Sequence, residues 1–75
     1  MSMRYVLLRM IGCKIECVVV PESQVKLMKK LMKNRQKFAD FAEIANWKPA
    51  VVPSNAKTVA ECSLNDEYYV LVREE

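Results

Sequence analysis

Apolar and β-branched residues fill two short stretches near the N-terminus, Arg4 to Ile11 and Lys14 to Val20. Gly12-Cys13 separates them, and glycine at the first position of a two-residue loop favours a type II′ turn. The two stretches therefore predict a β-hairpin. Apart from its arginines the first stretch is apolar on both faces, which indicates a central place in a sheet.

The C-terminal third predicts a second pair of strands. Lys57 to Leu64 alternates between apolar and polar residues, with Cys62 on the inward face. Glu67 to Arg73 has aromatic and branched residues on both faces, which is typical of a strand. Asn65-Asp66 lies between them and suits a tight turn, because both residues tolerate the left-handed conformation.

The segment from Val25 to Trp47 contains no glycine or proline and consists mostly of good helix formers. At about 100° per residue, its first apolar residues share one face, but Phe41 and Ile44 fall nearly a third of a turn away from it. This change of phase predicts a break near Asn34 to Gln36, with helices at Ser23 to Lys33 and about Lys37 to Asn46. The alternative is a single bent helix in which the stem of Arg35 crosses the apolar stripe.

These elements predict an α+β fold of ββα(α)ββ order, with a four-stranded, mostly antiparallel sheet and a helical layer on one face. The other face then lacks a cover. We expect it to be a partner or dimer surface, because open apolar sheet faces in small domains usually are. Its candidate residues are Tyr5, Leu7, Tyr69 and Leu71. The alternative is that the second helix and a loop from Pro49 to Asn55 wrap over it.

The chain has 75 residues, which predicts a single domain over residues 1–75 with frayed ends at 1–3 and 74–75. Its apolar runs are far shorter than the roughly 18 residues of a membrane span. Met1 to Arg9 lacks the order of charge, apolar run and small residues that marks a signal peptide. We therefore expect a soluble, cytoplasmic protein.

Three cysteines form an odd set, which favours a reducing compartment over a disulfide framework. Cys13 and Cys17 are spaced as C-x3-C, and in an extended segment they lie roughly 13 Å apart, too far for one metal. We therefore expect small core residues and no metal site.

The charge pattern supplies the sharpest candidate site. The net charge is +3, but six cations lie between Lys26 and Lys37 with no acid among them. On a helix, spacings of four, three and four place most of these lysines in one sector. The predicted polyanion-binding residues are Lys26, Lys29, Lys30, Lys33 and Lys37. The alternative is an ordinary solvated helix face. Binding to anionic lipid is disfavoured, because the strands need the apolar side of this helix for their own core.

The chain has no histidine and one glycine, so it lacks the commonest general base and any glycine-rich phosphate loop. We therefore expect no enzyme, no cofactor and no small-molecule substrate. The sequence favours a binding or regulatory protein that contacts a macromolecule stoichiometrically, either nucleic acid or an acidic protein surface, through its basic helix face. The alternative is a protein inhibitor or adaptor, a class that includes proteins encoded by viruses, or a homodimer, using an apolar sheet face or a strand edge.

Overall fold

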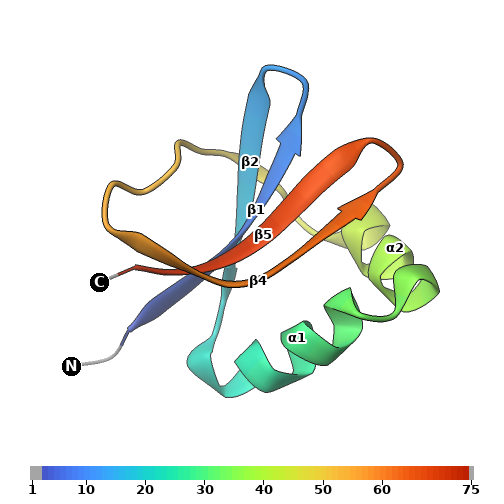
Figure 1. Cartoon of the computed structure of the whole chain (residues 1–75), viewed down its shortest axis with the longest axis horizontal. Helices are drawn as coiled ribbons and strands as arrows, with labels where there is room; N and C mark the ends of the chain where they lie inside the picture. The colour runs from blue at the N-terminus through green and yellow to red at the C-terminus, as the bar shows by residue number, and fades with distance from the viewer. Residues whose placement is uncertain (1–2, 75) are drawn as a thin grey trace.

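The structure is a computed structural model that describes residues 3–74. An N-terminal hairpin precedes a helical segment, and a short strand and a second hairpin follow it (Figure 1). The elements in chain order are β1 (Arg4–Ile11), β2 (Lys14–Val20), the 3-10 turn η1 (Glu22–Gln24), α1 (Val25–Met32), α2 (Arg35–Ile44), β3 (Lys48–Pro49), β4 (Ala56–Leu64) and β5 (Glu67–Glu74). The predicted α+β class is confirmed, with two helices between an N-terminal and a C-terminal hairpin.

All strand pairs are antiparallel, in the order β3-β2-β1-β5-β4. The sheet therefore has five strands, one more than predicted. The additional strand, β3, pairs Lys48 with Cys17 and Pro49 with Glu16, at the start of the segment that was expected to be a loop. β1 lies at the centre, as its two apolar faces indicated.

Both hairpin turns lie where the sequence predicts them. Gly12 has a φ of 58°, which a side chain would disfavour. Asn65 and Asp66 have φ values of 50° and 65°, and positive φ at both central residues is the type I′ arrangement. These turns set the register of the two hairpins.

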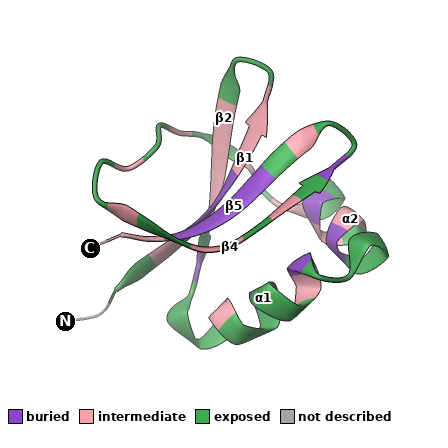
Figure 2. Cartoon of the chain, viewed as in Figure 1, coloured by how far each residue is buried: buried purple, intermediate pink, exposed green. Residues whose placement is uncertain are grey.

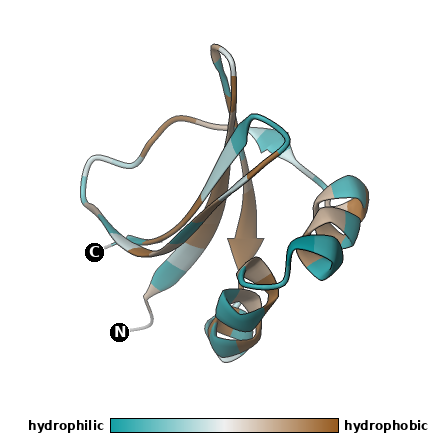
Figure 3. Ribbon diagram, turned by 45° about the vertical axis from the view of Figure 1, so that its right-hand side comes forward, coloured by the Kyte–Doolittle hydropathy of each residue, from teal (hydrophilic) through white to brown (hydrophobic). Residues whose placement is uncertain are grey.

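The helical segment breaks where its phase changes. α1 ends at Met32 and α2 begins at Arg35, and between them the Oδ1 atom of Asn34 accepts a hydrogen bond from the backbone N–H of Lys37 at 3.1 Å. Asn34 is thus the N-cap of α2. Arg35 is exposed at the start of the new helix, so it never crosses the apolar stripe. Both helices lie on the same side of the sheet, with hydrophilic residues on their outer sides (Figure 3).

Buried residues of the central strands lie on both faces of the sheet, which corrects the expectation of an open face; Figure 2 shows the buried stretch of β5. Leu7 and Leu71 lie directly opposite each other on the helix side, where both are 0% exposed, and Tyr69 beside them is 1% exposed. Tyr5 is half-buried against the same cluster. Strand pleating thus points these four residues towards the helices, so they form no exposed partner or dimer surface.

The opposite face holds a second buried cluster of Val6, Leu8, Val70 and Val72. Side chains from the flanking strands of the twisted sheet pack against it, among them Ile15 of β2 and Ala56 of β4. No helical layer is needed for this cover.

The C-terminal end of the described chain differs from the expectation. Glu74, expected to fray, lies in β5 and forms an ion pair with Arg4 at 3.7 Å. Met3 precedes β1 and is exposed, and the other residues expected to fray, 1–2 and 75, lie outside the described part. Within residues 3–74, no helix is long and apolar enough to cross a membrane.

Candidate functional site

All five lysines of the predicted polyanion site are exposed, but the helix break divides them. Lys26, Lys29 and Lys30 lie on α1 and Lys33 is its C-cap, whereas Lys37 belongs to α2. The continuous stripe that one helix would carry is therefore replaced by a cluster of four on α1. We call Lys26, Lys29, Lys30 and Lys33 the lysine face.

The lysine face has no acidic neighbour to neutralise it. α1 contains no acidic residue, and no ion pair joins these lysines to any residue in the described range 3–74. Its buried side carries Met28 and Met32, so the lysines occupy the solvent side of an amphipathic helix. Like charges at such spacings repel each other, and a nearby anion relieves that repulsion.

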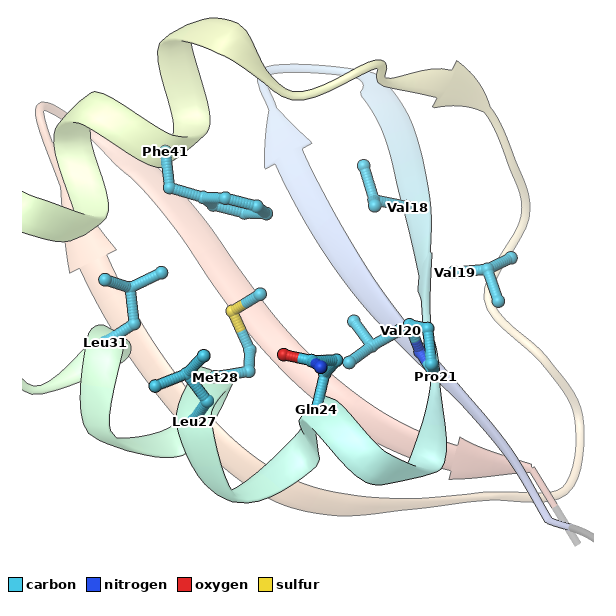
Figure 4. A pocket seen from close by; sticks show the side chains of 9 residues that line it. All are labelled: Val18, Val19, Val20, Pro21, Gln24, Leu27, Met28, Leu31 and Phe41. Carbon is cyan, nitrogen blue, oxygen red and sulfur yellow. The ribbon is translucent and has the colours of Figure 1, made fainter.

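An apolar groove of about 310 Å³ opens beside α1 (Figure 4). Leu27 and Leu31 of α1, Phe41 of α2 and Val18 and Val20 of β2 supply its main walls. We call this feature the apolar groove; its full lining is Val18, Val19, Val20, Pro21, Gln24, Leu27, Met28, Leu31 and Phe41.

The groove exists because the helical layer leaves one side of the sheet open. α1 packs towards β4, at the far edge, and nothing among the described residues fills the space between α1 and β2. Leu27 is consequently 62% exposed, although its helix is amphipathic. An exposed leucine beside a concave apolar surface is typical of a binding site.

The β2 strand also has an incomplete outer edge. Its ladder with β3 ends at the pair formed by Cys17 and Lys48, so within residues 3–74 no strand pairs with the outer edge of Val18–Val20. The carbonyl of Ile15 accepts a hydrogen bond from the N–H of Ala50 on that outer side, at 2.9 Å. Because backbone groups alternate sides along a strand, the N–H and C=O of Val19 point outwards too.

A cluster around Arg9 fastens the end of α2 to the sheet. The Nε and Nη2 atoms of Arg9 donate to Glu16 Oε1 at 3.1 and 2.6 Å, and its guanidinium lies 4.3 Å from the centre of the Trp47 ring. Trp47 Nε1 donates to the carbonyl oxygen of Ala42 at 2.8 Å. The Nε and Nη2 atoms of Arg9 and the Nε1 atom of Trp47 all have acceptors, so the cluster holds the end of α2 against the sheet.

Tyr69 and Cys62 are among the groups whose proton affinity the fold alters. Burial, reinforced by a hydrogen bond to Glu67, raises the pKa of Tyr69 to about 12, although Arg9 opposes the shift. Burial also raises the pKa of the Cys62 thiol, which makes it a poor nucleophile. Cys13 is exposed in the hairpin turn, and residues 3–74 contain no group of three acidic, cysteine or histidine side chains placed to hold a metal.

The sequence analysis identified the lysines but missed the groove. The available signals were the run of three valines before Pro21 and the position of Leu27 at the margin of the apolar stripe. No family model, curated protein or solved structure matches the chain. Its function therefore has to be inferred from the chemistry of the surfaces on and beside α1.

Proposed function

We propose that this protein is a binding protein that forms a stoichiometric complex with an acidic partner protein through α1. The observation that supports the proposal is that α1 carries the lysine face and, next to it, one wall of the apolar groove. Leu27 and Lys30 lie three residues apart, so they are neighbours on the helix surface. One partner surface with apolar and acidic residues satisfies both features.

The groove favours a protein over nucleic acid as the partner. Interfaces between proteins bury apolar cores within polar rims, which matches an apolar groove beside exposed lysines. Phosphate contacts engage lysines but leave an apolar groove empty. The cations of the face are lysines, which attract anions without the bidentate geometry by which arginine reads a base.

A selection from a random peptide library of about twelve residues, displayed on phage and panned on the immobilised protein, tests the proposal. We expect enriched peptides to combine apolar residues with aspartate or glutamate. Leu27→Asp should abolish their binding, and Lys30→Glu should weaken it by about tenfold or more. Lys14→Glu is the matched control, because Lys14 is an exposed lysine at the start of β2 outside the groove lining.

Two outcomes of the peptide selection would contradict the proposal. If no peptide is enriched, or if the enriched peptides bind the Leu27→Asp and Lys30→Glu variants as tightly as the natural protein, the proposal is wrong. Circular dichroism of each variant shows whether it is folded before binding is compared.

Nucleic acid is the second candidate partner, favoured by the absence of acidic partners around the lysine face in the described structure. If about four phosphates are neutralised, the slope of log K against log salt concentration is near −3.6. Anisotropy of a labelled mixed-sequence oligonucleotide measures it. Lys33→Glu should then abolish binding while Leu27→Asp leaves it unchanged, the reverse of the dependence on Leu27 expected for a protein partner.

A further inference from the structure

The two edges of the sheet differ in how they are protected. β4 forms one edge, and it carries a β-bulge between Thr58 and Ala60 and the exposed charges of Lys57 and Glu61. Bulges and charged residues are the usual means by which an edge strand avoids pairing with another chain. The β4 edge therefore has the character of a surface that stays unpaired.

The part of the β2 edge that β3 does not pair with, Val18–Val20, lacks both means of protection. Val18, Val19 and Val20 carry no charge, and the register of β2 with β1 runs without a bulge. Val19 is 53% exposed and presents its backbone N–H and C=O outwards, as the alternation from Ile15 shows. Three consecutive valines also have high strand propensity. This edge is suited to accept a further strand.

The free edge and the apolar groove form one continuous surface. Val19 lines the groove, yet its side chain points away from the other side chains of the lining (Figure 4). Its backbone therefore borders the groove. A strand added at Val19 would point every second side chain to the helix side of the sheet, into the space bounded by Leu27, Leu31 and Phe41.

The charges beside this surface define the occupant. Lys30 lies next to the Leu27 and Leu31 wall on α1, and Lys48 is exposed opposite Cys17, where β3 begins. Glu22 is the one exposed acidic residue in the turn after β2. The surroundings are thus mainly basic, which favours an extended segment with acidic residues between its apolar ones.

We infer that the partner docks as an extended acidic segment that adds to β2 at Val19 and places its apolar side chains in the groove. This inference rests on the function proposed above and specifies how the partner binds. The backbone of Val19 supplies two hydrogen bonds, and the groove selects the side chains that alternate with them. A short segment is sufficient, because β3 already occupies the edge at Glu16 and Cys17.

Amide hydrogen exchange, followed by NMR with the peptide enriched in the phage selection, tests strand addition directly. At saturation we expect exchange of the Val19 amide to slow by about tenfold or more. Val18 is the internal control, because its amide faces β1 and is paired in the free protein. Methylating one backbone nitrogen at a time along the peptide should weaken binding strongly at alternate positions only.

The outcomes separate the two proposals. Tight binding without protection of Val19, or with no alternating effect of methylation, overturns strand addition and leaves the acidic partner in place. Absence of any binding peptide overturns both. Light scattering of the purified protein tests whether a second copy of the chain occupies the edge. A dimer in which the Val19 amide is already protected would show this and overturn the inference.

Discussion

At the scale of single residues, the contrast between two arginine–glutamate pairs shows how burial decides the value of a charge. Arg9 and Glu16 have side chains 17% and 26% exposed and lie 2.6 Å apart, and the Arg9 guanidinium lies against the Trp47 ring. Arg4 and Glu74 are 60% and 31% exposed and lie 3.7 Å apart. Both pairs join neighbouring strands, so the second is a natural control for the first.

We predict that Glu16→Gln lowers the free energy of unfolding by about 1.5–3 kcal/mol, because the half-buried Arg9 guanidinium loses its charged acceptor. Glu74→Gln should cost less than about 1 kcal/mol, since an exposed pair gains little in water. Urea titrations of the three proteins measure both values. Equal losses in the two variants would show that the Arg9 pair contributes no more than a surface contact.

The raised pKa of Tyr69 leads us to predict that the folded protein loses stability at high pH. Its folded-state pKa of about 12 lies above the ordinary value of 10, so the unfolded chain releases this proton first. The stabilisation is complete below pH 10 and is lost as the pH rises towards 12. Chemical denaturation across this range should show a shallower decline for Tyr69→Phe than for the natural protein. Parallel declines would contradict the raised pKa.

At the scale of elements, local chemistry was sufficient for the sequence to predict both hairpins and the helix break. Gly12 and Asn65-Asp66 terminate strands through backbone geometry, and the phase change at Asn34 marks the end of one apolar face. β3 escaped prediction because a two-residue strand carries no periodicity and depends on pairing with Cys17. The groove could not be predicted because it depends on where α1 packs across the sheet. The periodicity of apolar residues shows which side of a helix is buried but not where on the sheet the helix lies.

The N-cap of α2, Asn34, is expected to stabilise the folded protein. Asn34→Ala should lower the free energy of unfolding by about 1 kcal/mol, because the backbone N–H of Lys37 loses its acceptor at the start of the helix. Asn46→Ala is the control, since Asn46 is exposed and follows the end of α2. The midpoint of urea unfolding compares them. If Asn46→Ala costs as much as Asn34→Ala, the cap has no special role.

At the scale of the whole molecule, the residues that form the core of the sheet differ from those that we propose to bind a partner. The central strands bury Leu7 and Leu71 on the helix side and Val6 and Val72 on the other. Dimerisation is therefore not required to cover a sheet face. Of the exposed large apolar residues, Leu27 and Val19 line the groove, whereas Ile44 at the end of α2 and Val51 in the following loop lie outside it. A surface that the core does not use is free to bind a partner.

We therefore predict that the purified protein elutes as a monomer in size-exclusion chromatography with light scattering, at both low and high salt. A salt-insensitive dimer would contradict this, because two copies would then share an apolar surface or the free edge of β2. Adding a mixed oligonucleotide pool at low salt extends the measurement to the lysine face. Co-elution that disappears at high salt and in Lys33→Glu would make nucleic acid the partner. A monomer that does not bind the oligonucleotides would instead favour the acidic partner protein, because that partner contacts the lysines and Leu27 together.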